Sequence, residues 1–398
     1  MNPVDTTNAI RDFYISYLTT QFGYSESLLG IVQGEPESPS LNDRFAETIR
    51  QRGILLKGPF LEATAPYESS TVTVRQLVAD NILCPEFAQL FEEPVSPITT
   101  PNVGFFNIPN ATPVSRRRVP FPADRPLYIH QEAAIRRLAA QDIAIAPHTV
   151  VASGTGSGKT ECFLLPIIDW IFRHPTRGDH PGKGIRALLV YPMNALVNDQ
   201  VRRLTELVGY WEGDIPLPIT FAKYTSETEN EKKEKAQQRE PRAPKNQLLT
   251  RQEIIRNPPD ILITNFAMLE QALLRPQEDP FFMDFDDFAW RFIVLDEAHS
   301  YRGTQAIELA RMFQRVRAAI QRDRRRSNRP ILQPICVATS ATLADPNQPE
   351  NERKAETAKF VRTIFGFDED NPNVVNSFPL ESVIFTNRID PAQDQPCH

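Results

Sequence analysis

Cysteine is scarce in this sequence, with four residues among 398, and none of the four has a partner at close spacing. Cys84, Cys162, Cys336 and Cys397 stand far apart and form no CxxC pair. This spacing argues against a zinc site and against a disulfide framework. It is typical of a protein from a reducing compartment, and we therefore expect a cytoplasmic location.

Long apolar runs are missing as well. The longest, CFLLPIIDWIF (162–172), is too short to cross a bilayer and is interrupted by Asp169. The first residues, MNPVDTTNAIRD, lack the basic region and the apolar block that mark a secretory signal. The sequence thus predicts no membrane partner.

Positive charge is not in excess, because 44 Lys and Arg residues stand against 50 Asp and Glu residues, for a net charge of −6. A basic field over the whole chain is therefore absent, and any nucleic acid would have to bind in a local groove. The hydrophobic content of 41% is ordinary for a globular protein. At about 100–200 residues per domain, the length predicts two or three folded units.

Proline is the residue in excess, with 35 in the chain. Eight prolines lie between Pro94 and Pro126, a density that excludes long helices and central strands. We therefore expect a proline-rich connector over 94–126. Before it, helical spacing of apolar residues over 9–22, 41–52 and 74–91 predicts an N-terminal helical accessory domain over 1–93.

After residue 126, short apolar runs alternate with helical patterns, which predicts an α/β domain over 127–375 with a doubly wound parallel sheet. The runs are five to seven residues long and few alternate strictly, as expected of strands buried on both faces. The predicted strands are 149–153, 187–192, 219–224, 260–265, 291–297 and 334–340. The predicted helices between and after them are 161–172, 195–208, 267–274, 305–319 and one near 354–367.

The stretch SGTGSGKT (153–160) lies between a predicted strand and a predicted helix. It matches the phosphate-binding pattern G-x-x-x-x-G-K-[ST] except that Ser153 replaces the first glycine. The helix start attracts anions, and Lys159 would reach the β- and γ-phosphates while Thr160 places its hydroxyl on Mg²⁺. A flexible turn with a solvated lysine is the alternative. The predicted nucleotide-binding residues of the loop are Gly154, Thr155, Gly156, Ser157, Gly158, Lys159 and Thr160.

An acidic pair, Asp296 and Glu297, ends another predicted strand. Active groups of open α/β sheets lie at the carboxyl ends of strands, so Asp296 would hold Mg²⁺ beside Thr160. Glu297 would orient and deprotonate the water that attacks the γ-phosphate. A helix cap is the alternative for such a pair taken alone.

His299 has no His or Cys partner at metal-ligand spacing. We therefore expect it to couple the acidic pair to a neighbouring loop, whose hydroxyls come from Ser340 and Thr342 at the end of the next strand. A helix cap is again the alternative for the Ser340–Thr342 segment.

The stretches GTGSGKT, DEAH and SAT, in this order, resemble motifs I, II and III of superfamily 2 helicases, the DEAD/DEAH-box class. YPMNALVNDQ (191–200) resembles motif Ia and ILITNFAMLEQALLRP (261–276) resembles motif Ib. LYIHQEAAI (127–135) is similar to the upstream glutamine motif, which implies that Gln131 reads adenine. The Tyr-Arg-Gly after the acidic box (301–303) resembles the branch of mitomycin-repair and RecQ-like helicases, and KGPFLEATAPYES (57–69) resembles large helicases of that branch, including the antiphage systems DISARM and Druantia.

The resemblance implies ATP and Mg²⁺ as cofactors and the first RecA-like lobe of a helicase as the fold. It also implies that single-stranded DNA, or RNA, runs past Pro192, Asn194, Thr264 and Asn265. Polar groups there would grip phosphates without reading bases. An N-cap at Asn194 and a strand-to-helix turn at 264–265 are the alternatives.

A superfamily 2 motor needs two such lobes, and the second carries arginines that reach the γ-phosphate. No Q-x-x-G-R-x-G-R segment occurs in these 398 residues. We therefore expect 376–398 to begin a linker toward a second lobe, supplied in cis or by a partner chain. Without that lobe, the chain would hydrolyse ATP slowly and unwind nothing. Another P-loop NTPase and a non-catalytic regulatory module are the alternative functions.

Overall fold

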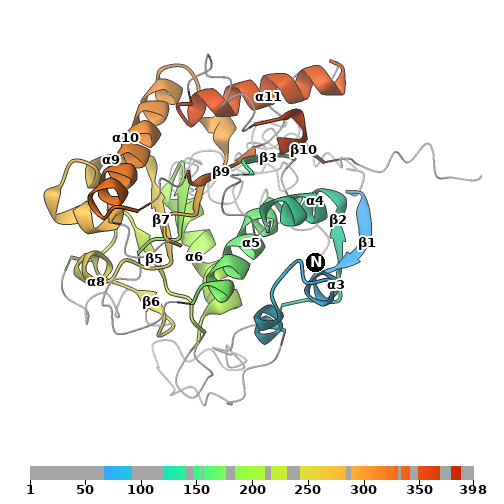
Figure 1. Cartoon of the computed structure of the whole chain (residues 1–398), viewed down its shortest axis with the longest axis horizontal. Helices are drawn as coiled ribbons and strands as arrows, with labels where there is room; N and C mark the ends of the chain where they lie inside the picture. Colours follow the sequence, from blue (N-terminus) through green and yellow to red (C-terminus); the bar gives the residue numbers. More distant parts are fainter. Residues whose placement is uncertain are drawn as a thin grey trace, which may run out of the picture. The chain divides into compact units, whose positions relative to one another are not determined.

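Parallel strands organise the described part of the chain into one large sheet (Figure 1). The sheet has eight strands in the order β10-β3-β9-β8-β4-β7-β5-β6. They are β3 Thr149–Ala152, β4 Ala187–Tyr191, β5 Phe221–Tyr224, β6 Gln247–Leu248, β7 Ile261–Asn265, β8 Phe292–Leu295, β9 Ile335–Ser340 and β10 Val383–Phe385. The six apolar runs predicted as strands are β3, β4, β5, β7, β8 and β9, and the doubly wound α/β class is confirmed.

The computed structural model describes eleven ranges of the chain, and all belong to the unit Pro66–His398. A second unit, Met1–Ala65, contains the helices predicted over 9–22 and 41–52, and these lie outside the described residues. The ranges are 67–91, 121–139, 147–154, 156–175, 184–210, 217–230, 243–283, 288–329, 333–340, 348–367 and 378–386.

Helices cover both faces of the sheet because successive side chains of each strand point to opposite faces. In β4, Leu189 packs into the cluster that contains α5 Lys159–Arg173 and α6 Asn194–Val208. The adjacent residue, Leu188, packs on the other face of the sheet, with α9 Phe266–Ala272, α10 Thr304–Arg326 and α11 Glu350–Ile364.

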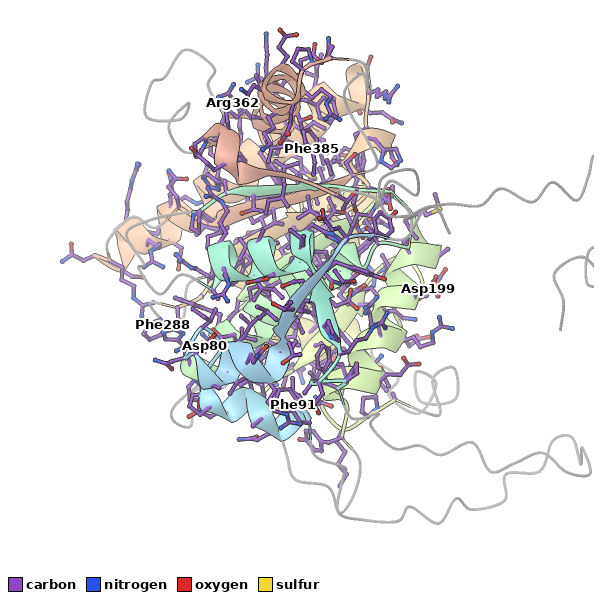
Figure 2. All side chains as sticks on the ribbon, turned by 90° about the vertical axis from the view of Figure 1, so that its right-hand side faces the viewer. Asp80, Phe91, Asp199, Phe288, Arg362 and Phe385 are labelled. Atoms are coloured by element: carbon purple, nitrogen blue, oxygen red, sulfur yellow. The ribbon has the colours of Figure 1, made fainter. Side chains whose placement is uncertain are left out.

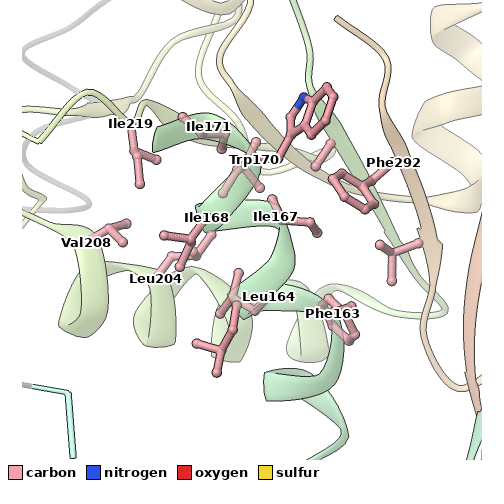
Figure 3. Packing of buried hydrophobic residues seen from close by; sticks show 14 of the residues in the cluster. Phe163, Leu164, Ile167, Ile168, Trp170, Ile171, Leu204, Val208, Ile219 and Phe292 are labelled. Carbon is pink, nitrogen blue, oxygen red and sulfur yellow. The ribbon is translucent and has the colours of Figure 1, made fainter. Parts of the chain in front are cut away.

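Helix α5 lies at the centre of the layer that it forms with α6 on one face of the sheet. Figure 3 shows its apolar side chains between α6, which contributes Leu204 and Val208, and Phe292 of β8. Eleven consecutive residues of α5, Cys162–Phe172, are buried. The helix is therefore enclosed on all sides, which fixes the direction in which its N-terminus meets the sheet edge.

The segment 67–91 packs into this same layer (Figure 2). Strand β1 Ser69–Thr73 pairs antiparallel with β2 Pro126–Tyr128, and the chain then forms α3 Val74–Ala79 and the 3-10 helix η2 Pro85–Leu90. The single helix predicted over 74–91 is wrong. Asn81 adopts φ +57°, and Pro85 cannot continue a preceding helix.

At both ends, the folded unit extends beyond the helicase domain predicted over 127–375. Leu77 and Phe87 share a core with α5, although the helicase domain was expected to begin at 127. Val383–Phe385 forms β10 beside β3, within the range 376–398 expected to be a linker. The folded unit therefore takes in core residues before the predicted domain and a sheet strand after it.

Five further helical elements in the described residues were not predicted from the apolar spacing. They are α4 Ile129–Leu138, α8 Arg251–Arg256, η3 Pro276–Phe282, η4 Ala298–Ser300 and η5 Leu380–Ser382. Among the described residues, no helix combines the length and the apolar character needed to span a bilayer.

Candidate nucleotide and nucleic-acid site

The glycine loop lies where β3 ends and α5 begins. Its two left-handed positions are Gly156, at φ +77°, and Gly158, at φ +72°. The Ser153 amide donates to the Ser340 carbonyl of β9 at 2.9 Å, and the Ser153 and Ser157 hydroxyls are hydrogen-bonded to each other. The loop is therefore fixed to the sheet at its start, and it leads into the N-terminus of a long buried helix, where anions bind.

Lys159 is the first residue of α5, and its side chain is only 10% exposed. Its Nζ lies 3.3 Å from the Ser153 carbonyl oxygen and 3.4 Å from Oε1 of Glu297. The structure thus brings together the loop lysine and the acidic pair predicted to share one nucleotide. Thr160 follows in the first turn, half-buried, whereas Thr155 lies outside the described residues.

Asp296 comes directly after β8 and is held by two donors. Its Oδ1 accepts hydrogen bonds from the Thr339 hydroxyl and from the Glu297 amide, the latter at 2.9 Å. Burial raises the pKa of the Asp296 carboxyl, and the Thr339 hydrogen bond opposes this only in part. A half-buried carboxylate at a strand end is chemically suited to a hard cation such as Mg²⁺.

Sequence reasoning missed Thr339, although a signal for it exists. Strands β8 and β9 are parallel neighbours in which Leu295 pairs with Ala338. The next residues along, Asp296 and Thr339, therefore face each other. Adjacent parallel strands with polar residues at their last positions would have been enough to suggest this contact.

His299 lies between the acidic pair and the end of β9. Its Nδ1 is 3.2 Å from Oε2 of Glu297 and 3.3 Å from Oγ of Ser340. This is the bridge expected from the sequence, while Thr342 lies outside the described residues. Glu297 itself has left-handed backbone angles, with φ +53°, which turn its side chain back toward Lys159 and His299.

Helix α4 contacts the glycine loop through two consecutive residues. The Gln131 side chain accepts from the Tyr128 amide at 3.0 Å and donates to the Gly158 carbonyl at 3.1 Å. Nε2 of His130 lies 2.8 Å from the Ser157 carbonyl oxygen, and burial lowers the pKa of His130. His130 was not among the predicted residues. Its place beside Gln131 on the first turn of a helix was the available signal.

A cavity of about 480 Å³ adjoins this contact. Gln131, Tyr128 and Gly158 line it on one side, and Phe121 and Arg203 line it elsewhere. Aromatic rings and apolar side chains mixed with a few polar groups are typical of a cavity that binds a flat organic ring.

The residues predicted to contact nucleic acid lie at neighbouring strand ends. Tyr191 of β4 pairs with Asn265 of β7, and Nδ2 of Asn265 donates to Oδ1 of Asn194 at 2.7 Å. Asn265 also caps α9 by accepting from the Met268 amide, while the N-cap of α6 is Met193 rather than Asn194. Pro192 precedes these residues at the β4 end and is half-buried.

Thr264 differs from the other predicted contact residues. It is 1% exposed, and its hydroxyl donates to the Tyr224 carbonyl of β5 at 2.6 Å. This geometry gives Thr264 a place between β5 and β7 rather than on the open edge. Its side chain therefore holds the strands together.

A parallel α/β sheet with a glycine loop, a lysine and an acidic pair at one edge defines a nucleotide-binding lobe of the P-loop type. A family model described as DEAD/DEAH box helicase matches residues 128–349, more than half of the chain. The chain belongs to the DEAD/DEAH box helicase family.

Relatives include the Druantia protein DruE of Escherichia coli, which is 30% identical in a match that covers 54% of this chain and 16% of DruE. The uncharacterized ATP-dependent helicase YprA of Bacillus subtilis is 27% identical over 56% of this chain and 24% of YprA. The chain therefore spans about a sixth to a quarter of the length of these relatives. A solved structure, the DUF1998 helicase MrfA bound to DNA, is similar at a TM-score of 0.40 and 23% identity, over 61% of this chain and 26% of MrfA.

Proposed function

We propose that this chain is the ATP-binding motor lobe of an ATP-dependent helicase or translocase that moves on single-stranded DNA, with RNA as the alternative substrate. The observation that carries the proposal is the approach of Lys159 Nζ to within 3.4 Å of Glu297, beside the half-buried Asp296. Membership of the DEAD/DEAH box helicase family supports it.

The residues present fit ATP with Mg²⁺. No heavy atom lies within 4 Å of where a Gly156 Cβ would stand, so the loop leaves space above the helix start. Backbone amides of 154–158 and the Lys159 ammonium would hold the phosphates. Thr160 and Asp296 would hold Mg²⁺, which neutralises charge on the β- and γ-phosphate oxygens when bound. Gln131, beside the cavity, would contact the adenine.

Glu297 is the residue we assign as general base. Its carboxylate would orient the attacking water and take its proton, while Lys159 and His299 hold the two carboxylate oxygens in place. Since His299 also touches Ser340, a shift of Glu297 would reach the end of β9. We assign His299, Ser340 and Thr342 to the coupling of hydrolysis to movement.

The strand ends next to the ATP site would hold the nucleic acid. Asn194 and Asn265 carry amide groups that can bind phosphates of any sequence, and Pro192 lies beside them. Such a grip needs only local positive or neutral donors, which agrees with a net charge of −6. Thr264 is buried and would support this surface by holding β7 against β5.

A second RecA-like lobe, in cis or on a partner chain, is part of the proposal. An arginine from that lobe would raise the rate of ATP hydrolysis by about 10³–10⁵-fold. The 398-residue chain by itself would therefore hydrolyse ATP slowly and unwind nothing. The similarity to DruE supports a role in antiphage defence, and bacterial DNA repair is the alternative suggested by the resemblance of the motifs.

The test compares two substitutions in the purified chain. Lys159→Ala should weaken binding of a fluorescent ATP analogue at least tenfold, because the phosphates lose a buried cation. Glu297→Gln should keep that affinity and lower single-turnover ATP hydrolysis about 10²-fold or more, the size of a general-base contribution.

The matched controls are Lys354→Ala, on α11, and Glu308→Gln, exposed on α10, and both should behave as wild type. Unchanged ATP affinity in Lys159→Ala would refute the nucleotide site. Normal binding with no hydrolysis under any condition would instead favour a non-catalytic regulatory module.

A further inference from the structure

A second cavity, of about 600 Å³, lies between the end of β5, α8 and η3. Side chains with N–H donors dominate its lining. They are Asn230, Arg251, Gln252, Arg256, Arg275 and Gln277. Among the described lining residues the acidic one is Glu278, so three arginines face a single carboxylate. The cavity therefore carries a local excess of positive charge on a chain whose net charge is −6.

Contacts within the wall fix the guanidinium groups. Arg251 donates to the Thr225 carbonyl at 2.9 Å and to the Thr228 carbonyl at 3.2 Å, and it stacks over the Tyr224 ring at 5.2 Å. Arg275 lies 3.2 Å from Glu278, a buried residue. Because these arginines are already ordered, a ligand would not have to immobilise them.

Arg256 also lines the cavity and is exposed to solvent. It stands four residues after Gln252 on α8, so the two side chains share one face of the helix. An exposed arginine backed by two ordered ones gives forked donors from several directions, which suits the oxygens of a phosphate.

The cavity continues the row of strand ends at which Asn194 and Asn265 lie. Tyr224, in its wall, is the last residue of β5, and β5 is the direct neighbour of β7 in the sheet. Thr264 of β7 donates to the Tyr224 carbonyl. Neighbouring strands are about 4.8 Å apart, so the cavity begins one strand beyond Asn265 along the same edge.

We propose that this cavity binds a backbone phosphate of the same single strand that passes Asn194 and Asn265, which extends the nucleic-acid track toward the β6 edge. The proposal rests on the proposed function. Its ligand chemistry is the phosphodiester, and the donors would read no base, in keeping with a motor that steps over any sequence.

The experiment measures binding of a fluorescent single-stranded DNA to the full chain by anisotropy, over a series of salt concentrations. Arg256→Gln should weaken binding about fivefold to tenfold and reduce the slope of log K against log salt by about 0.7, the value for one phosphate contact on a single strand. Arg256→Lys, which keeps the charge, should retain most of the affinity. Arg256→Gln with Arg275→Gln should reduce the slope further.

Arg251 is left unchanged because it holds the loop after β5. The control is Arg136→Gln on α4, whose partner is Glu132 at 2.8 Å, and its affinity and slope should equal those of wild type. Since Arg256 is exposed, its replacement should leave thermal unfolding unchanged.

The possible results distinguish a failure of this inference from a failure of the proposed function on which it rests. If wild type binds DNA and Arg256→Gln binds equally with the same slope, the cavity is not on the track and the inference is overturned. If the variants bind DNA normally but lose binding of inorganic phosphate, the cavity takes free phosphate and the inference is likewise overturned. If wild type binds no DNA, the proposed nucleic-acid track fails and the inference fails with it.

Discussion

Gly156 and Gly158 lie two residues apart in the loop after β3, and both have left-handed backbone angles. Their surroundings differ. A Cβ on Gly156 would meet no atom within 4 Å, whereas a Cβ on Gly158 would come within 2.4 Å of Nε2 of Gln131. That Nε2 donates to the Gly158 carbonyl, so the side chain of Gln131 on helix α4 packs directly against the loop at Gly158.

We predict that Gly156→Ala costs about 1–2 kcal/mol of unfolding free energy, the strain of a left-handed residue. Gly158→Ala should cost about 2–4 kcal/mol, because it also displaces Gln131 and breaks its two hydrogen bonds, worth about 1 kcal/mol each. In a Gln131→Ala background the cost of Gly158→Ala should fall to that of Gly156→Ala. Urea unfolding of the four combinations measures this, and equal costs in both backgrounds would show that Gln131 and the loop are uncoupled.

For single residues, the sequence predicts those that belong to a short local motif. It misses those that reach the site only through contacts between distant parts of the chain. Lys159, Asp296 and Glu297 belong to short motifs, and the structure brings them together. His130 lies inside the stretch that resembles the glutamine motif, and Thr339 directly precedes SAT, but neither is a residue to which those motifs assign a role. They act through contacts with residues 27 and 43 positions away along the chain, which only the packing of neighbouring elements reveals.

Among the elements, the central strands are predictable because burial on both faces leaves continuous apolar runs of the right length. Strand β10 lies at the sheet edge and has only three residues, of which Val383 is buried and the next two are half-buried, so it gives no such run. The break between α3 and η2 was visible in Pro85, but the apolar spacing across it resembles one helix. Periodicity thus identifies elements that the core surrounds and fails where an element is short or interrupted.

Two hydrogen bonds join helix α5 to the segment 67–91. Asp169 accepts from the Cys84 amide at 2.5 Å, and Arg173 donates to the Ile82 carbonyl at 3.0 Å. The two side chains also form an ion pair within α5, with Arg173 Nε 2.7 Å from Asp169, whose side chain is 3% exposed. These contacts satisfy the Ile82 carbonyl and the Cys84 amide in the turn between α3 and η2.

Asp169→Ala should lower the free energy of unfolding by about 2–4 kcal/mol, because the buried Cys84 amide and the half-buried Arg173 would both lose their acceptor. Asp199→Ala is the control, since Asp199 (Figure 2) forms an exposed ion pair with Arg202 at 3.5 Å, and its loss should cost about 0–1 kcal/mol. Chemical denaturation measures both values. A cost for Asp169→Ala no larger than that of the control would show that Asp169 does not fasten the segment to α5.

At the scale of the whole unit, the order of motifs predicts the site better than it predicts the limits of the fold. Strands β3, β9 and β8 are consecutive in the sheet, so their ends bring residues 153–160, 340 and 296–299 to one edge. The limits depend on segments at both ends that add strands and core residues without motifs, as 67–91 and 383–385 do. Proline density marks where regular structure stops, but not which flanking segment packs on the sheet.

One buried histidine links distant parts of the unit. His148, immediately before β3, stacks on Phe378 at 4.5 Å, and its Nδ1 accepts from the Cys336 amide of β9 at 2.9 Å. Burial, with a smaller contribution from the nearby cations Arg317, Arg137 and Arg291, lowers the pKa of His148 to about 3. The ring therefore stays neutral in the folded chain throughout the ordinary pH range.

A folded-state pKa below the unfolded value of about 6.5 means that the unfolded chain binds more protons between pH 6.5 and 3, so folding stability falls as the pH falls through that window. Between pH 7.5 and 5.5 this one residue should cost about 1.4 kcal/mol. His148→Phe keeps the stacked ring and cannot titrate. It should be less stable at pH 7.5, because the Cys336 amide loses its acceptor, yet it should lose about 1.4 kcal/mol less than wild type on going to pH 5.5. Unfolding curves of both chains at the two pH values give this difference directly, and a difference of zero would mean that His148 is not the group that takes up the proton when the unit unfolds.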